Sequence, residues 1–177
     1  MPLTIQLPAQ ENQTAFNLRR WGELQWDQDL ARLPYTIETD RFGRIIMSPP
    51  PALDHTKRVA AILRRLHQCF PQGEVLPETA ISTTDGVKVT DAAWLSPARS
   101  QELNAGPCLL RAPEICIEVL SPSNSQLEMA EKRALYFEAG ASEVWICGLD
   151  GSMTFHLRPD LSQSDRSGLC PDFPSQI

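Results

Sequence analysis

Extended runs and amphipathic helical segments alternate along this chain, and their order constrains the fold more than any other feature of the sequence. A run rich in Ile and Val at 114–120 predicts a central strand. The Ser125-x-x-Glu128 capping box after it predicts the start of a helix, for which Gly140 is a suitable end. The expected buried stripe of this helix is Leu127, Ala130, Ala134 and Phe137. Two extended runs on either side of a short glycine-containing turn are typical of a hairpin.

The expected elements follow the order hairpin, helix, hairpin, strand, helix, hairpin, and a short helix precedes them. They are a helix before residue 34, strands at 35–39 and 44–47, a helix from 53 to 70, strands at 74–82 and 87–95, a strand at 114–120, a helix between the caps at 125 and 140, and strands at 143–147 and 152–157. This order predicts an α+β domain with a mixed sheet.

The length of 177 residues predicts one domain, because domains commonly hold about 100–200 residues. We expect a loose segment at 1–17, a single domain at 18–158 and a loose tail at 159–177. The tail contains several prolines, serines and aspartates and shows little apolar periodicity.

The net charge of −6 excludes a general electrostatic attraction to nucleic acid, so an anionic partner would have to meet a local basic patch. The N-terminus has no basic start, and no long apolar run follows, so neither a signal peptide nor a membrane span is expected. The five cysteines are scattered and form no C-x-x-C pair, which favours a reducing cytoplasm and a role as small core residues.

Two acidic residues, Asp91 and Glu118, interrupt strands that are otherwise apolar. A buried carboxylate needs a compensating cation, so these residues would pair with basic side chains or bind a metal. If their strand faces converge, they could hold Mg²⁺, which can activate water against a phosphodiester. Spacing alone leaves open the alternative that each lies at an exposed strand edge.

Several segments together resemble one family. They are YTIE at 35–38, GRIIMSPP at 43–50 with His55 after it, GVKVTD at 86–91, APEICIEVLSPS at 112–123, and EKRALYFEAG at 131–140 followed by EVW at 143–145. Over about 35–157 the chain is similar to the Uma-two family of restriction-endonuclease-like proteins, within the PD-(D/E)XK nuclease superfamily. The resemblance implies a mixed sheet flanked by helices and metal-dependent hydrolysis of DNA by Mg²⁺ or Mn²⁺.

The resemblance also implies roles for particular residues. Asp91 and Glu118 match the acidic metal ligands of the superfamily motif, whereas Thr90 replaces its usual proline and Leu120 its usual lysine. The family keeps a lysine on the following helix, which makes Lys132 the expected catalytic substitute, with Tyr136 one turn later. An alternative is a surface Lys132 paired with Glu128. Lys88 is a weaker candidate because it alternates to the other strand face from Asp91.

A second group of residues falls in matching segments and could add a ligand or a proton-transfer group: Glu38, His55 and Glu78. For DNA phosphates, the best local basic surface is the helix that carries Lys57, Arg58, Arg64 and Arg65, although such residues more commonly form a solvated helix face. The function expected is endonucleolytic cleavage of DNA, with a homodimer as a compatible arrangement. The rival is a catalytically silent nucleic-acid-binding or interaction module on the same fold.

Overall fold

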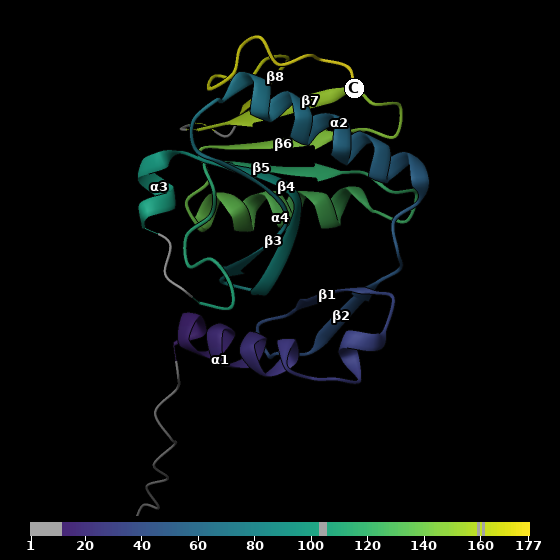
Figure 1. Cartoon of the computed structure of the whole chain (residues 1–177), viewed down its shortest axis with the longest axis vertical. Coiled ribbons are helices and arrows are strands. Elements are labelled where there is room, and N and C mark those ends of the chain that lie inside the picture. Colours follow the sequence, from purple (N-terminus) through teal and green to yellow (C-terminus); the bar gives the residue numbers. More distant parts are fainter. Residues whose placement is uncertain (1–11, 103–105, 159, 161) are drawn as a thin grey trace, which may run out of the picture.

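A twisted six-stranded sheet forms the centre of the molecule, with helices on both faces and a smaller helix–hairpin layer beside it (Figure 1). The computed structural model describes residues 12–102, 106–158, 160 and 162–177. The elements in chain order are α1 (Gln13–Gln25), the 3-10 helix η1 (Leu30–Arg32), β1 (Thr36–Thr39), β2 (Ile45–Ser48), α2 (Leu53–Cys69), β3 (Glu74–Thr83), β4 (Gly86–Leu95), α3 (Pro97–Gln101), β5 (Ile115–Val119), α4 (Gln126–Glu138), β6 (Glu143–Cys147), β7 (Met153–Leu157) and β8 (Ser162–Ser164).

The large sheet has the strand order β3-β4-β5-β6-β7-β8, and β5 pairs with β6 in parallel while the other pairs are antiparallel. The predicted α+β architecture with a mixed sheet flanked by helices is therefore confirmed. Strands β1 and β2 form a separate hairpin that lies beside β4. None of the helices in the described part of the chain combines the length and the apolar character needed to span a membrane.

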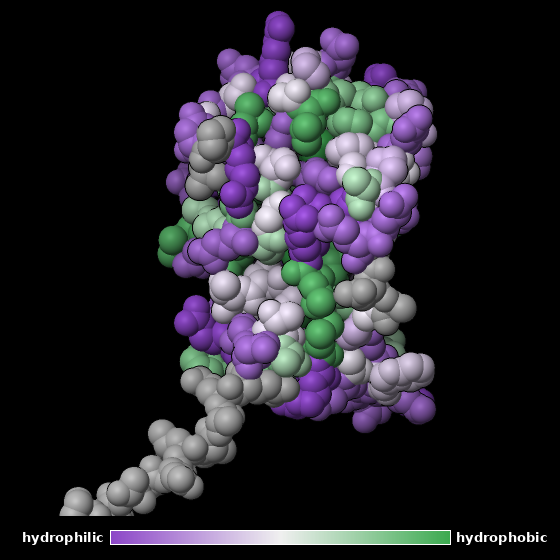
Figure 2. Space-filling model, turned by 90° about the vertical axis from the view of Figure 1, so that its left-hand side faces the viewer, coloured by the Kyte–Doolittle hydropathy of each residue, from purple (hydrophilic) through white to green (hydrophobic). Residues whose placement is uncertain are grey.

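The two faces of the sheet bury different side chains. Helix α2 packs Ile62 and Leu66 onto one face, against a core that includes Trp145 and Phe155. Helix α4 covers the other face with Tyr136 and Phe137. A third cluster joins α1 to the start of β4. On the side that Figure 2 shows, polar residues cover much of the surface, and apolar atoms gather in a strip at the level where the helix–hairpin layer meets the sheet.

The C-terminal segment differs from the loose tail that the sequence predicts. Strand β8 pairs with β7, and Cys170 and Phe173 are buried in the core beneath α2. The Phe173 ring lies 4.6 Å from that of Trp145. Few apolar residues suffice here because Cys170 and Phe173 enter the core and Ile177 packs against it. Of the predicted loose start at 1–17, residues 1–11 lie outside the described residues, and α1 begins at Gln13, with the Asn12 side chain accepting a hydrogen bond from Ala15 N.

Helix α4 has the predicted capping box, but its predicted buried stripe of Leu127, Ala130, Ala134 and Phe137 is wrong in two places. Leu127 is 69% exposed and Ala134 is exposed. The face turned to the sheet instead carries Met129, Tyr136 and Phe137, with Lys132 between them. Polar partners on β5 draw Lys132 and Tyr136 inward, so apolar periodicity alone misplaces the buried face.

Candidate active site

Asp91 and Glu118 lie where β4 and β5 separate. The last backbone pair between these strands is Ala92 with Ile117, and Asp91 and Glu118 are the next residues along. The Thr90 hydroxyl donates to Ile117 O (2.8 Å) and accepts from Ile117 N (3.0 Å). Asp91 Oδ2 accepts from Val119 N at 2.7 Å. Side chains thus replace the ladder hydrogen bonds, which leaves room for a pocket between the strand ends.

Glu118 is only 5% exposed, and both of its carboxylate oxygens have partners on α4. The Tyr136 hydroxyl donates to Oε1 at 2.6 Å, and the Lys132 ammonium donates to Oε2 at 3.0 Å. Burial raises the pKa of the Glu118 carboxyl to about 8, the charges of Asp91 and Glu38 add to this rise, and Lys132 opposes it. Desolvation is thus the main reason that the neutral form of this carboxyl is favoured.

Acceptors on three separate strands surround the Lys132 ammonium. Its ammonium lies 3.0 Å from Glu118, 2.9 Å from Glu38 Oε1 on β1, and 3.1 Å from the carbonyl oxygen of Val89 on β4. Burial alone would lower the pKa of Lys132, but the Glu118 and Glu38 carboxylates outweigh burial and raise that pKa. The alternative of a surface Lys132 paired with Glu128 does not hold, because the lysine is directed into the interior.

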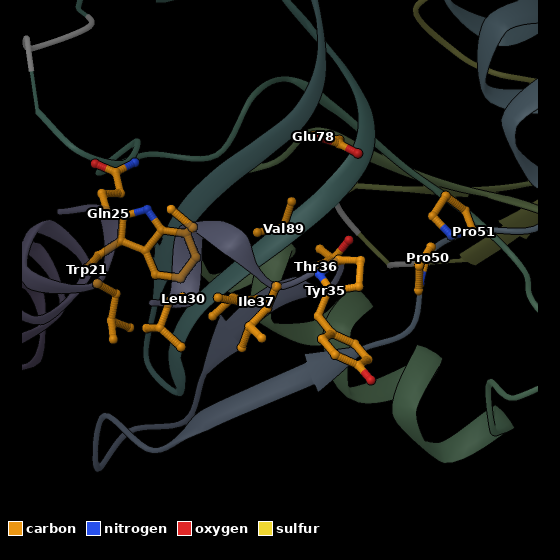
Figure 3. A pocket seen from close by; sticks show the side chains of 14 residues that line it. Trp21, Gln25, Leu30, Tyr35, Thr36, Ile37, Pro50, Pro51, Glu78 and Val89 are labelled. Atoms are coloured by element: carbon orange, nitrogen blue, oxygen red, sulfur yellow. The ribbon is translucent and has the colours of Figure 1, made fainter. Parts of the chain in front are cut away.

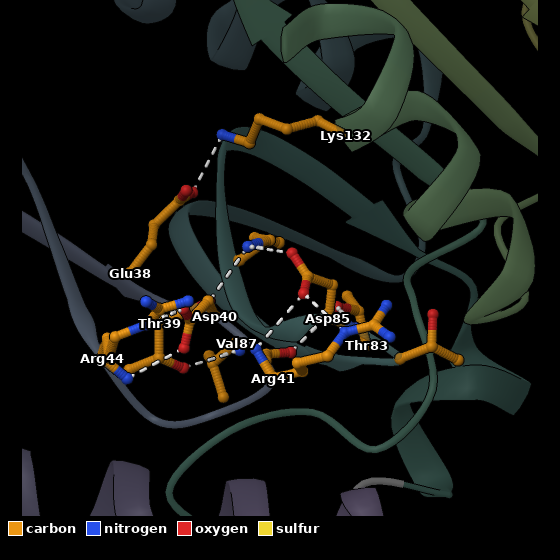
Figure 4. Close-up of polar contacts among 12 residues, drawn as sticks. Glu38, Thr39, Asp40, Arg41, Arg44, Thr83, Asp85, Val87 and Lys132 are labelled. Atoms are coloured by element: carbon orange, nitrogen blue, oxygen red, sulfur yellow. Dashed lines mark hydrogen bonds and ion pairs between the residues drawn. The ribbon is translucent and has the colours of Figure 1, made fainter.

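The β1–β2 hairpin reaches the site because polar contacts attach it to β4 (Figure 4). Val87 N donates to the Thr39 hydroxyl and Lys88 Nζ to the Thr39 carbonyl, both at 2.9 Å. Glu38 Oε1 in turn accepts from Val89 N at 2.8 Å. Lys88 itself is buried outside the carboxylate site, as its alternation along the strand predicts.

His55 and Glu78 line the same pocket as Asp91. His55, in the first turn of α2, places Nε2 3.3 Å from Asp91 Oδ2, and this contact raises the pKa of the imidazole above its ordinary value. Its Nδ1 is buried without a hydrogen-bond partner among the described residues. Glu78 falls opposite Asp91 in the β3–β4 register and has φ 43°, a left-handed conformation that is strained for glutamate.

These side chains surround a small polar pocket of about 110 Å³. We call it the polar pocket; its lining residues are Thr36, Glu38, Ser48, Pro49, Pro51, His55, Glu78, Val89, Asp91, Glu118, Val119, Ser121, Asn124, Glu128 and Lys132. The lining holds more carboxylates than basic groups, so a cation is the species that its electrostatics favour.

A magnesium-type ion fits the chemistry of this donor set, although the protein does not form a complete cage for it. Within the described ranges, no group of three or more His, Cys, Asp or Glu side chains is arranged to hold a metal ion. Mg²⁺ commonly takes only one or two carboxylates and keeps several waters. Asp91 and Glu118 line the same pocket, and Asp91 Oδ1 accepts no hydrogen bond from the residues that the structure describes.

The basic residues predicted to meet DNA lie along α2, away from the sheet-facing Ile62 and Leu66. Lys57 is 4.0 Å from Asp54, Arg58 donates to Leu149 O, and Arg65 donates to Gln68; Arg64 is exposed. Since His55 begins the same helix, this surface adjoins the polar pocket at one end. The sequence interpretation treats Thr90 only as a replacement for proline and misses its two hydrogen bonds to Ile117.

A mixed sheet with an acid-lined pocket at a strand separation and a lysine supplied by the adjacent helix is the arrangement of a nuclease-type domain. A family model named Uma2, described as "Putative restriction endonuclease", matches residues 26–171, and the chain belongs to this family. The family resemblance predicted from the sequence is therefore confirmed, and it places the chain among nucleases in general.

A solved structure supports the fold. It is the crystal structure of "a putative nuclease belonging to DUF820" from Anabaena variabilis, which matches with a TM-score of 0.63 and 20% sequence identity. The match covers 76% of this chain and 79% of that chain. At this identity the likeness shows a shared fold. No curated protein matches the sequence.

Proposed function

We propose that the protein is an endonuclease that hydrolyses DNA phosphodiester bonds with Mg²⁺ or Mn²⁺. The observation that carries the proposal is that Asp91 lines the polar pocket together with Glu38 and Glu118, the two carboxylates that pair with the Lys132 ammonium. A phosphate could approach these carboxylates only if a cation offset their charge. Membership of a nuclease family supports the same function.

Asp91 and Glu118 would hold the metal. A bound divalent ion supplies positive charge for the phosphate and lowers the pKa of a water molecule. Because two carboxylates keep Lys132 protonated, its role would be to stabilise developing negative charge and not to remove a proton. Tyr136 would orient Glu118 through its hydrogen bond, and His55 would orient Asp91.

One observation favours the alternative of a catalytically silent module. The Lys132 ammonium already bridges Glu118 and Glu38, so an internal cation offsets part of the charge that would otherwise attract a metal. The net charge of −6 also disfavours tight binding of nucleic acid. This alternative predicts a fold that neither binds divalent metal at this pocket nor cleaves DNA.

Metal titration and plasmid nicking separate the two functions. We expect calorimetry with Mn²⁺ to show saturable binding, and supercoiled plasmid to be nicked with Mg²⁺ or Mn²⁺ but not with chelator. Asp91→Ala should remove both properties. Glu102→Ala, which changes an exposed acid paired with Arg111, is the matched control and should retain both. Metal binding that survives Asp91→Ala would place the metal elsewhere.

Binding of DNA phosphates by α2 is a separate part of the proposal and has a salt-dependent signature. Replacing Lys57, Arg64 and Arg65 together by Gln should flatten the dependence of log affinity on log salt, by about 0.9 for each phosphate that the variant no longer neutralises. Arg58 is left in place because it donates to Leu149 O. An unchanged slope would mean that α2 does not face the DNA.

A further inference from the structure

A larger, mainly apolar cavity adjoins the polar pocket. It has a volume of about 590 Å³, within the range of ~300–1,000 Å³ that is usual for small-ligand sites. We call it the apolar cavity; it is lined by Trp21, Leu24, Gln25, Leu30, Ala31, Leu33, Pro34, Tyr35, Thr36, Ile37, Pro50, Pro51, Glu78 and Val89. Thr36, Pro51, Glu78 and Val89 line both spaces, so the two are neighbours along one surface.

The side chains of the apolar cavity suit a flat, partly polar ligand. Figure 3 shows Trp21 at one end of the lining and Pro51 at the other, with Leu30, Ile37 and Tyr35 between them. Trp21 is only 8% exposed, yet its indole Nε1 has no acceptor among the described residues. Indole nitrogen only donates, and buried donors are normally paired. This nitrogen is closed to solvent, so an acceptor atom on a bound ligand would complete this hydrogen bond after the neighbouring side chains move aside.

We propose that the apolar cavity receives one unstacked nucleobase of the DNA strand whose phosphate lies at the polar pocket; this inference rests on the proposed function. Aromatic and apolar side chains bind the faces of any base, and every base carries acceptor atoms for the Trp21 N–H. The cavity lining offers Glu78 as its one carboxylate and no basic group, so it suits an uncharged base and leaves the phosphate outside.

The strained Glu78 backbone lies at the boundary between base and phosphate. Its left-handed conformation interrupts the β3–β4 pairing between Pro77 and Thr79, next to the point where the two spaces meet. A base can enter the cavity only after leaving its stack, which costs less in single-stranded or mismatched DNA. The substrate class is therefore DNA with an unpaired nucleotide at the cleavage position.

Binding of fluorescein-labelled single-stranded oligonucleotides to the full chain tests this inference. The titrations use Ca²⁺ buffer, and the strand is checked afterwards for intactness. A set of oligonucleotides carries one abasic site, moved stepwise along the strand. We expect the abasic site to weaken binding roughly 5- to 100-fold at one position and little elsewhere, because one stacked base is missing there.

Three variants assign that effect to the cavity. Tyr35→Ala should weaken binding of the intact oligonucleotide and remove its advantage in affinity over the abasic one. Phe42→Ala changes an aromatic side chain that is 70% exposed outside the cavity, and it should keep the advantage. Trp21→Phe keeps the aromatic ring but loses the N–H, so it should reduce the advantage about 3- to 10-fold, the size of one hydrogen bond. Melting curves check that each variant folds.

The outcomes distinguish this inference from the proposed function. Absence of DNA binding, a uniform effect of abasic sites, or equal weakening of intact and abasic strands by Tyr35→Ala overturns the inference. If metal-dependent nicking occurs in that case, the proposed function stands alone. Base-dependent binding that Tyr35→Ala abolishes supports the inference even if no metal yields cleavage, and then only the proposed hydrolysis fails.

Discussion

Two buried glutamates on adjacent parallel strands have different surroundings. Glu143 on β6 is 4% exposed and Glu118 on β5 is 5% exposed. Glu143 accepts hydrogen bonds from Trp145 Nε1, Ser167 Oγ and Leu169 N, each at 2.7 Å. Glu118 instead accepts from a tyrosine and an ammonium group and lines the polar pocket together with four further acids: Glu38, Glu78, Asp91 and Glu128.

Burial of an acid therefore does not by itself identify a functional site. Neutral donors surround Glu143, and two of them belong to the C-terminal segment, so this carboxylate attaches that segment to the sheet. Charged groups surround Glu118, and carboxylates outnumber basic groups among them. Its pocket also has space for another group. An excess of like charge beside a cavity is the feature that distinguishes Glu118.

The largest effect should come from replacing each glutamate by glutamine. Glu118→Gln should lower metal-dependent nicking about 10³-fold, because a charged ligand and its electrostatic effect are both removed. Glu143→Gln should leave the rate within a few fold. In Glu143→Gln, either orientation of the new amide places its NH₂ group against an N–H or O–H donor. The lost hydrogen bond should lower Tm by roughly 3–12 °C. Nicking rates and melting curves of both variants provide the measurement.

This pair of results can fail in an informative way. Equal loss of nicking in the two variants would mean that Glu118 acts through folding, as Glu143 does. Tyr136 can rotate its hydroxyl to accept from a glutamine amide, so Glu118→Gln should remain folded and its nicking defect should persist at low temperature.

The second expected effect concerns the ammonium group. Lys132→Met should lower nicking about 10²- to 10³-fold while the fold is retained, because the protein then offers no positive charge between Glu38 and Glu118. Arg99→Met is the matched control: Arg99 is also buried and lies 3.7 Å from Glu114, but it does not line the polar pocket. We expect Arg99→Met to reduce Tm and to spare the rate measured on folded protein. A rate unaffected by Lys132→Met would remove the lysine from the mechanism.

The third effect is a pH dependence of stability in chelator. A carboxyl with a raised folded pKa contributes stability that is complete below its unfolded pKa of about 4.3 and is lost as pH rises through its folded value. For Glu118 this loss falls between the unfolded value and about 8. The Tm of Glu118→Gln relative to wild type should therefore be higher at pH 8 than at pH 5, by roughly 2–8 °C. An equal Tm difference at the two pH values would contradict the raised pKa. The lower Tm of Glu143→Gln should persist at both pH values.

The sequence predicts most of the sheet because its strands alternate clearly and its turns contain glycine. The strands at 74–82, 87–95 and 143–147 lie within one residue of their observed bounds. The capping box also places α4 correctly. Acids in apolar strands lead to Asp91 and Glu118, and the structure places both in one pocket with Lys132. Their metal-binding and catalytic roles stay predictions.

Other features depend on contacts that no local pattern carries. The C-terminal segment lacks periodicity because it is held by Glu143 and by single residues such as Phe173. Helix α4 turns Lys132 inward because its partner, Glu118, lies on β5. The two hydrogen bonds of Thr90 to Ile117 exist only after β4 and β5 meet. In each case the deciding interaction joins residues far apart in the sequence.

The smallest expected effect tests the neutral donor of each glutamate. Tyr136→Phe removes the hydroxyl that donates to Glu118, which should lower nicking about 5-fold, the size of one hydrogen bond. That hydrogen bond also lowers the pKa of Glu118, so its loss should move the acidic limb of the pH–rate profile to higher pH. Trp145→Phe removes the corresponding donor to Glu143 and should reduce Tm without moving the limb. A pH profile left unchanged by Tyr136→Phe would mean that ionisation of Glu118 does not control the reaction.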